Sequence, residues 1–388
     1  MSILIKNGNV YNVYTGEFKK LDILIKDTKI KTIRENITID DDNIINAEGK
    51  NIFPGFIDAH SHIGMWPDVK NGNDANECVN PVTQNMRAID GLNPMDKDLV
   101  EVMEEGFTTI MITPGSGNVI CGQAAIIKTG GRTYKDMIVN PYAAFKMALG
   151  ENPKNVYGSI NKSPSSRMST AFILEENLTK GREYYNKRVN GLIEKNIELE
   201  PYMDVFSGKV PLKIHCHRAD DICTAIRIAE SFSLDYTLDH CTEGYLIKER
   251  LKEINKPLLM GPIYMFRSKQ EVRNRDLCGI ISLVKEGCEV SFISDHPVIN
   301  CGYMLKFLGL SLKKGLSYKD AIKMVTINPA KALKIDNITG SLEEGKDADI
   351  VIYDGDPLEG YTKNLVTIVN GEIKYNKLSE KQVIVWFY

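Results

Sequence analysis

Long apolar runs are missing from this 388-residue sequence. A helix that crosses a lipid bilayer needs about 18 to 20 consecutive apolar residues, and no stretch approaches that length. Blocks of like charge are missing as well, because 48 Lys and Arg residues stand against 51 Asp and Glu residues, with a formal net charge of -3. Since nucleic acids and anionic membranes attract clustered basic residues, we expect neither as a partner.

Two further signals are lacking. The first residues, MSILIKNGNV, do not follow the charged, apolar and small-residue order of a secretory signal peptide. The eight cysteines form no C-x-x-C pair and lie mostly within apolar stretches, which is typical of reduced, buried thiols. We therefore expect a cytoplasmic protein without a disulfide framework.

What the sequence contains is two textures, and the first belongs to the chain ends. Residues 2–56 and 347–375 are short alternating runs such as LDILIKDTKIKTI and DADIVIYDGDPL, broken by Asn-Gly and Asp-containing turns that are typical of hairpins. Two ends of matching β character predict one small β-sandwich domain, built from residues 1–56 and 336–388.

The middle, residues 57–335, alternates helix and strand. Residues 96–113 and 276–293 each predict an amphipathic helix that Glu-Gly closes before a buried strand begins. Further apolar strands are expected at residues 143–148, 212–215, 235–239 and 257–260. Apolar strands between helices predict a mostly parallel sheet with both faces covered, either doubly wound or closed into a barrel.

The position of the polar residues decides between these two sheets. The stretches FPGFIDAHSH, AAFKMALG, PLKIHCH, YTLDHC and EVSFISDH each lead from an apolar strand into His, Lys or Asp. In a barrel the carboxyl ends of the strands form a single mouth, where active sites of that fold lie. The convergence favours a (β/α)8 TIM barrel.

Histidine is scarce, and its few positions share one feature. All six lie at or just past predicted strand ends: His60, His62, His215, His217, His240 and His296. In PGFIDAHSHIG, Asp58, His60 and His62 occupy every second position, so their side chains should leave one face of an extended strand. Several neutral imidazoles with a carboxylate oxygen suit Zn2+, with Mn2+ or Fe2+ as alternatives. The pattern predicts a metal centre.

Two more polar residues interrupt or end apolar strands. Lys146 lies mid-strand in AAFKMALGENPK, where a buried ammonium group is costly. It either forms an ion pair or reacts with carbon dioxide to give a carbamate that bridges two metals, and Glu151 is a rival oxygen ligand. Asp295 in SFISDHPV either caps a turn or acts as general base, because a bound cation lowers the pKa of its water to about 7.

These stretches resemble the metal-dependent amidohydrolase superfamily. PGFIDAHSHIG is similar to its first-strand His-x-His signature, and NPAKALKI followed by GSLEEGKDADIVIYDGDPL is similar to its exit from the barrel into the β domain. The resemblance spans nearly the whole chain. KMALGENPKNVYG, HCHRADDI and DHCTEG most resemble the imidazolonepropionase-related group, whose nearer relatives include prolidase-like and other cyclic-amide or peptide hydrolases.

The resemblance implies a role for each motif residue. His60 and His62 would hold the more buried metal, and Asp295 would touch it and act as general base. Lys146 stands where some relatives carry the bridging carbamate. His240 would bind the second metal.

The fifth predicted strand leaves two readings open, because His215 and His217 both face inward by alternation. His215 matches the usual ligand best, which leaves His217 as a substrate contact or a support for the ligands. With only His60, His62, His215 and Asp295 as ligands the site would hold one ion, and His240 would polarise the substrate carbonyl.

One departure bears on the substrate. Imidazolonepropionases resemble HADE after the fifth strand, with a glutamate that aids catalysis, whereas this chain reads HCHR and places Arg218 there. A cation cannot take over that proton transfer, so a substrate bearing a carboxylate is favoured over histidine-degradation chemistry. Arg218, Arg167 and Arg267 are candidate anion clamps, since guanidinium binds carboxylate bidentately; each is alternatively a surface ion-pair partner.

Three remaining features have structural interpretations. The Gly-rich stretches at 114–118 and 122–131 lack a phosphate-binding motif and are expected to be loops at the mouth. Residues 171–200 predict surface helices or a lid. Cys241 is expected to be an inert buried thiol, with a ligand role as the alternative.

The sequence thus predicts a metal-dependent hydrolase of small molecules. Metal-activated water would cleave an amide-type C–N bond in a cyclic amide, an N-acyl amino acid or a dipeptide. The alternatives are a metal-dependent deaminase of a heterocycle and a non-catalytic amidohydrolase-like scaffold. A homo-oligomer is expected from the relatives.

Overall fold

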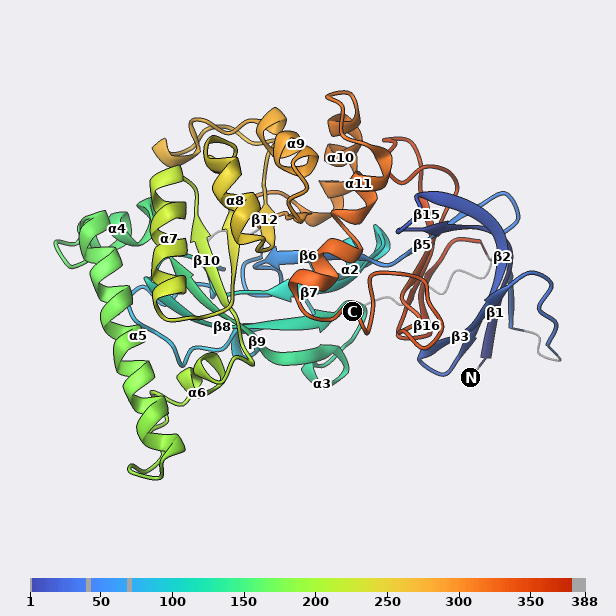
Figure 1. Cartoon of the computed structure of the whole chain (residues 1–388). Coiled ribbons are helices and arrows are strands. Elements are labelled where there is room, and N and C mark those ends of the chain that lie inside the picture. The colour runs from blue at the N-terminus through green and yellow to red at the C-terminus, as the bar shows by residue number, and fades with distance from the viewer. Residues whose placement is uncertain (1, 40–42, 68–71, 379–388) are drawn as a thin grey trace.

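Two sheets of eight strands organise the protein. The computed structural model describes residues 2–39, 43–67 and 72–378. In Figure 1 the sheet built from the chain ends, in blue and red, lies to one side of the larger sheet and its surrounding helices.

The smaller domain takes strands from both chain ends. Its strand order is β16-β15-β14-β5-β1-β2-β3, with β4 pairing β1. The strands are β1 (Ser2–Asn12), β2 (Glu17–Lys26), β3 (Lys29–Arg34), β4 (Ile44–Asn46), β5 (Asn51–Pro54), β14 (Ile350–Tyr353), β15 (Asn364–Val369) and β16 (Glu372–Asn376). Antiparallel pairing of β5 with β14 joins the two ends, and buried isoleucines such as Ile23, Ile52 and Ile350 form a separate core. The predicted β domain from both termini is confirmed; its exact boundary residues stay a prediction.

The larger sheet forms the barrel, in the order β13-β12-β11-β10-β9-β8-β7-β6. Its strands are β6 (Phe56–Ser61), β7 (Phe107–Ile112), β8 (Ile120–Lys128), β9 (Ile138–Ala148), β10 (Leu212–Cys216), β11 (Tyr236–His240), β12 (Leu258–Met260) and β13 (Val290–Phe292). Backbone hydrogen bonds close it between the first strand and the segment after the last: Asp295 N donates to His60 O (3.1 Å), and His62 N to His296 O (2.9 Å). The predicted (β/α)8 barrel class is confirmed.

Helices pack around the barrel. They are α1 (Ala88–Gly91), α2 (Lys97–Glu104), α3 (Tyr134–Met137), α4 (Glu151–Gly158), α5 (Arg167–Val189), α6 (Pro201–Phe206), α7 (Ala219–Ser231), α8 (Lys248–Ile254), α9 (Leu277–Lys285), α10 (Met304–Leu312), α11 (Tyr318–Lys323) and α12 (Ile327–Ala332), with 3-10 turns η1 (Gly244–Ile247), η2 (Gln270–Val272) and η3 (Cys301–Tyr303). The side chains of Asp96 and Asp276 cap α2 and α9. After both of these helices a glycine with positive φ, Gly106 or Gly287, precedes the next strand, as predicted.

The barrel departs from the prediction at β8. Residues 122–131 were expected to be a loop, but most of them belong to β8, which is buried along its length and runs antiparallel to both β7 and β9. The backbone of Gly122, with φ 126°, lies against Met86 O. A Cβ at this position would lie only 2.3 Å from that oxygen, which is too close for any residue other than glycine. The glycine signal therefore marks close approach within a strand.

The long polar stretch is a surface helix. α5 begins at a capping box of Ser166 and Ser169 and lies along the outer edge of the barrel in Figure 1. None of its described residues lines the cavity at the barrel mouth that is described in the next section, so the structure does not support a lid. Among the described helices, none has both the length and the apolarity that a bilayer span requires.

Candidate metal centre and active site

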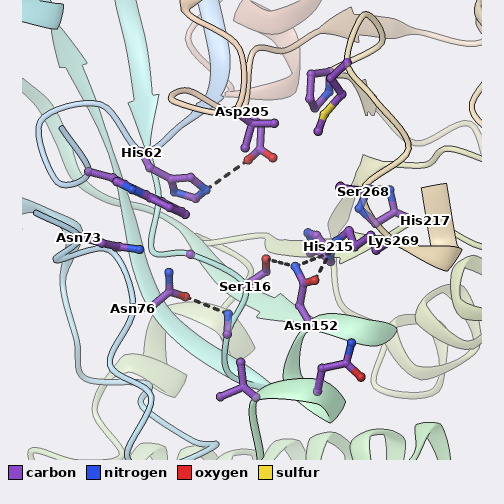
Figure 2. A pocket seen from close by; sticks show the side chains of 18 of the residues that line it. His62, Asn73, Asn76, Ser116, Asn152, His215, His217, Ser268, Lys269 and Asp295 are labelled. Atoms are coloured by element: carbon purple, nitrogen blue, oxygen red, sulfur yellow. Dashed lines mark hydrogen bonds and ion pairs between the residues drawn. The ribbon is translucent and has the colours of Figure 1, made fainter. Parts of the chain in front are cut away.

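A cavity of about 450 Å³ opens at the carboxyl ends of the barrel strands. Figure 2 shows His62 and Asp295 on one side and His215, His217 and Lys269 on the other. Residues 115–117, in the loop before β8, form part of its wall, as predicted for the first Gly-rich stretch. The histidines arrive from strands far apart in sequence because parallel strands end at the same rim.

One group of ligand-type atoms lies at the barrel seam. Oδ1 of Asp295 is 3.2 Å from Nε2 of His60 and 3.2 Å from Nε2 of His62. The other ring nitrogen of each histidine is already occupied: Nδ1 of His60 is 2.9 Å from Asp239 Oδ2, and Nδ1 of His62 is 2.7 Å from the carbonyl oxygen of Thr113. Because these oxygens only accept hydrogen bonds, Nδ1 donates and Nε2 presents its lone pair to Asp295.

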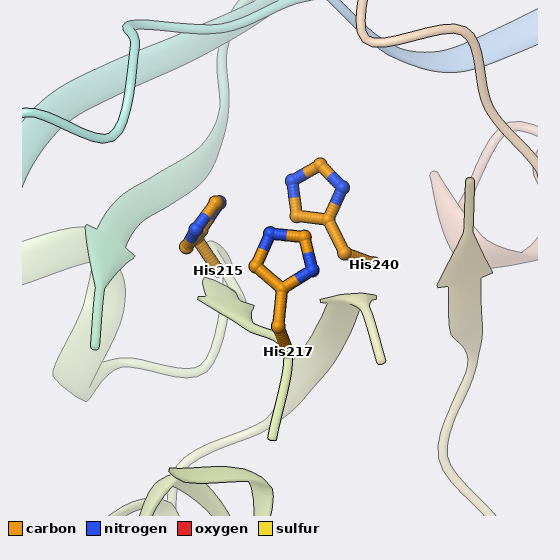
Figure 3. Close-up of side chains that lie close together, drawn as sticks. All are labelled: His215, His217 and His240. Atoms are coloured by element: carbon orange, nitrogen blue, oxygen red, sulfur yellow. The ribbon is translucent and has the colours of Figure 1, made fainter. Parts of the chain in front are cut away.

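A second group consists of His215, His217 and His240 (Figure 3). One nitrogen of each lies within 4.8 Å of the other two, and His240 also completes a group with His60 and Asp295 at the same separation. Nδ1 of His240 donates to Gly261 O (2.7 Å), which leaves its Nε2 free toward both groups. His240 is therefore shared between two adjacent potential ion sites.

Four of these histidines, His60, His215, His217 and His240, are uncharged at neutral pH. Burial lowers the pKa of His60, lowers that of His215 to about 4, and lowers those of His217 and His240 well below the usual value. Neighbouring positive charges, Lys146 for His60 and Lys269 for His217, act in the same direction. Neutral imidazole is the form that binds a metal ion.

The residues fit a cation. Nε2 of His240 and Nδ1 of His215 are buried and have no hydrogen-bond partner among the described residues. The lone pairs of His60 and His62 face an anionic oxygen at 3.2 Å, which is repulsive unless a positive charge lies between them. Buried nitrogens without partners and converging lone pairs are what a divalent cation satisfies, and three or more nitrogens with a carboxylate suit Zn2+.

The Asp295 side chain is held as an anion. Burial opposes its ionisation, but positive charge at the surrounding His240, His60 and His62, such as a bound cation would supply, favours the anion and lowers its pKa well below the usual range. The backbone of Asp295 (φ 55°) and of His240 (φ 67°) is left-handed, which is uncommon for residues other than glycine. Such strain collects at functional sites, where the surrounding structure enforces an orientation.

Beneath the histidines lies a buried charge network that the sequence analysis missed in part. Asp239 accepts hydrogen bonds from Lys146 Nζ (3.0 Å) and Lys213 Nζ (3.2 Å). Burial opposes the ionisation of Asp239, but the two ammonium groups and His60 hold its pKa well below the usual range. Burial also lowers the pKa of Lys213 to about 8. Lys146 thus occupies the ion pair that the sequence left as an alternative to the carbamate.

Glu271 is a second residue that the sequence analysis missed. Its Oε1 lies 3.8 Å from His215 Nε2, 3.7 Å from His217 Nε2 and 2.6 Å from Lys269 Nζ. Burial opposes its ionisation, yet His215 and Lys269 lower its pKa to about 2. Glu151, the predicted rival ligand, contacts Glu271 through backbone N–H groups and joins neither potential ion site in the described part of the chain.

Some predicted positions are corrected. Asp58 does not join the histidines, because a register shift in β6 between Asp58 and Ser61 interrupts the alternation; its carboxyl group binds Ser294 instead. His296 points to Asp98 of α2, with Nε2 2.8 Å from Oδ2. Cys241 is a buried thiol whose pKa is raised by burial, and it belongs to neither potential ion site.

The three predicted anion clamps lie away from the main cavity. Arg218 pairs with Asp220 (2.7 Å) and Arg167 with Asp221 (2.9 Å), and both arginines line a separate cavity behind Glu151. Arg267 is exposed and does not line the main cavity. The ion pairs support the surface ion-pair alternative for Arg218 and Arg167, and a substrate contact by any of the three arginines stays a prediction.

Comparisons with known proteins agree with this geometry. The profile of the amidohydrolase family matches residues 182–384. A crystal structure of an amidohydrolase from Thermotoga maritima MSB8 is 36% identical, with a TM-score of 0.94, over 97% of this chain and 100% of that chain.

Two curated relatives are more distant. Amidohydrolase tasK of Hapsidospora irregularis is 27% identical over 85% of this chain, which spans only 37% of that protein's length. An imidazolonepropionase of Picrophilus torridus is 24% identical over 98% of each chain.

Proposed function

This chain belongs to the amidohydrolase family of enzymes that hydrolyse carbon–nitrogen bonds, and on that premise we propose that it is a metal-dependent hydrolase of a small cyclic amide, N-acyl amino acid or dipeptide. The observation that carries the proposal is the pair of adjacent ligand groups that share His240, next to the cavity that His215, His217 and Asp295 line. A non-catalytic scaffold has no need for buried nitrogens with converging lone pairs.

We propose His60, His62 and Asp295 as ligands of one ion and His215 and His240 as ligands of a second. His217 lies in the second group and is either a ligand or a substrate contact. Zn2+ suits this donor set, with Mn2+ or Fe2+ as alternatives. Lys146 could join only as a carbamate, because an ammonium group has no lone pair to donate.

The chemistry follows from the positions of the protein groups. When bound, a divalent cation lowers the pKa of a water ligand to about 7 and polarises a substrate carbonyl. Asp295 is ionised and stands at the cavity wall, so it can take a proton from the attacking water and deliver it to the leaving nitrogen. If a single ion binds, His240 can polarise the carbonyl only as the imidazolium, because Nδ1 donates to Gly261 O and the neutral Nε2 carries a lone pair.

Metal content and a substrate screen test the proposal together. We expect about two equivalents of metal in the purified protein and turnover in a panel of cyclic imides, N-acyl amino acids and Xaa-Pro dipeptides. One equivalent would restrict the centre to a single ion, and a metal-free, inactive protein would favour the scaffold. A carbamate would appear as label from isotope-enriched bicarbonate that the Lys146→Met variant does not take up.

One observation keeps the deaminase as a second candidate. The run HCHR lacks the acidic group that a deaminase usually carries after the fifth strand, but Glu271 brings a carboxylate within 3.8 Å of His215 from another segment. Release of ammonia from a heterocycle, without ring opening or peptide cleavage, would identify this activity.

A further inference from the structure

The charges that line the main cavity are unbalanced. Among the described lining residues Asp295 alone is acidic, whereas Lys269 and Arg275 are basic, and the remaining polar residues other than histidine are neutral amides and hydroxyls such as Asn76, Asn152 and Ser116. A bound divalent cation would add further positive charge. The cavity is therefore electrostatically complementary to an anionic ligand.

The two basic residues differ in one respect. Lys269 is already neutralised, because its Nζ lies 2.6 Å from Glu271 Oε1 and donates to Asn152 Oδ1 at 2.7 Å. Arg275 forms no ion pair with any carboxylate of the described residues, and its hydrogen bond within the protein runs from Nη1 to Met265 O at 3.3 Å. Its charge is the one that lacks a counter-ion.

The partial burial of Arg275 makes its lack of an ion-pair partner energetically costly. The side chain is half-buried, and burial lowers its pKa, with Asp295 opposing the shift through its negative charge. Asp295 offsets only part of the cost of burying this charge, because the two side chains form no direct ion pair. A guanidinium taken partly out of water without a partner is costly, and a ligand that supplies a carboxylate removes that cost.

We propose that Arg275 binds the carboxylate of the substrate and thereby selects substrates that carry an amino-acid carboxylate near the scissile C–N bond. This inference rests on the proposed hydrolase. It narrows the substrate class to N-acyl amino acids, dipeptides or carboxylated cyclic amides, and it transfers the anion-binding role from Arg218, Arg167 and Arg267 to a residue that the sequence analysis did not consider.

The test compares N-acetyl-L-amino acids with the matching N-acetyl-L-amino acid amides on metal-loaded enzyme. We expect the wild-type enzyme to prefer the acids, and Arg275→Met to lower kcat/KM for the acids by about 10- to 100-fold through a higher KM, with the amides unchanged. Arg275→Lys should retain part of the preference. Arg273→Met is the matched control, because it removes the same charge from an exposed position two residues away that does not line this cavity.

A binding measurement separates this inference from the proposed function. Trp66 lines the cavity, with its ring 6.0 Å from that of His62, and Trp386 is the second tryptophan of the chain. In a Trp386→Phe background, stopped-flow fluorescence of Trp66 reports binding of the same acids and amides before turnover. We expect the protein to bind the acids more tightly than the amides, and we expect Arg275→Met to abolish this difference in affinity.

Each outcome is decisive. Equal use of acids and amides by the wild type, or an unchanged preference in Arg275→Met, overturns the role of Arg275 and leaves the hydrolase in place. If no compound is hydrolysed, the proposed function fails, and fluorescence alone then decides: acid-selective binding lost in Arg275→Met supports the clamp, and binding without that selectivity overturns it.

Discussion

Nδ1 of His60 lies 2.9 Å from Oδ2 of Asp239, so a carboxylate buried in the barrel fixes which nitrogen of His60 faces Asp295. The same carboxylate forms ion pairs with Lys146 and Lys213, which are themselves buried. Asp239 therefore connects the orientation of a proposed metal ligand to the charge balance of the barrel interior.

Asp239→Asn tests that connection. Removing the charge leaves two ammonium groups buried without an anion, so we expect the free energy of unfolding of the metal-free protein to fall by about 3–5 kcal/mol. Metal affinity should fall by about 10- to 100-fold, as for other residues that orient a ligand. Urea unfolding and competition with a chelator measure the two effects.

A compensating change serves as the control. Lys213→Met in the Asp239→Asn background restores the original balance of buried charge, so part of the stability should return while the metal affinity stays low. If Asp239→Asn binds metal as tightly as the wild type, Asp239 does not orient His60.

Asp295→Asn addresses the proposed general base. The amide cannot accept the proton of water at neutral pH, so we expect turnover to fall by about 10²- to 10⁴-fold while bound metal is retained. Steady-state kinetics and metal analysis of the same preparation provide the measurement. Retained activity would remove Asp295 from the proton transfer.

Gly261→Ala tests the support of His240. Gly261 has φ 145°, and a Cβ there would lie 2.2 Å from Ile293 O. Alanine must therefore shift the backbone at position 261, and with it the carbonyl oxygen of that residue, which accepts the hydrogen bond from His240 Nδ1. We expect about 1–3 kcal/mol of destabilisation from backbone strain, together with weaker metal binding.

Gly287→Ala is the matched control for this substitution. Gly287 has φ 88° with open space around the position of a Cβ. It should cost about 1–2 kcal/mol and leave metal affinity unchanged. Equal metal affinity in both variants would show that the Gly261 carbonyl does not position His240.

A surface cluster predicts one part of the pH dependence of stability. Asp235 lies 2.7 Å from Lys334 Nζ and 2.9 Å from Lys256 Nζ; burial raises its pKa, but the two lysines outweigh this and lower it. A lowered carboxyl pKa stabilises the fold above the unfolded value of about 3.9, and the contribution is lost as the pH falls through the folded value.

The expected size of this contribution is small. The Asp235 side chain is 37% exposed, and solvent screening limits such pairs to about 1 kcal/mol or less. Asp235→Asn should thus be slightly less stable than the wild type at pH 7, with the difference closing below about pH 4. Urea unfolding between pH 7 and pH 3 measures it, and a constant difference would exclude Asp235 as its source.

The fold class could be predicted from sequence because it depends on patterns that recur along the chain. Helix, glycine and buried strand follow one another at α2 and α9, and the hairpin signals at both ends define the β domain. The antiparallel direction of β8 could not be predicted, since a buried strand has the same composition in either direction.

The site was predictable where a residue lies on a barrel strand or just past its end, and not where it lies farther along a loop. Lys213 carries the same signal as Lys146, a lysine within an apolar strand, and should have been found with it. Glu271 and Arg275 belong to the irregular segment after β12, where no periodicity shows which side chains turn inward. The oligomeric state, the cytoplasmic location and the identity of the metal stay predictions.

The backbone bond from Asp295 to His60 has a consequence for how the enzyme matures. It joins two segments more than two hundred residues apart in the chain. It closes the barrel where Asp295, the proposed base, meets His60, a proposed metal ligand. A nascent polypeptide cannot form the active site until its last barrel strand has docked against the first. Any assay of turnover therefore also counts the molecules in which the barrel is closed.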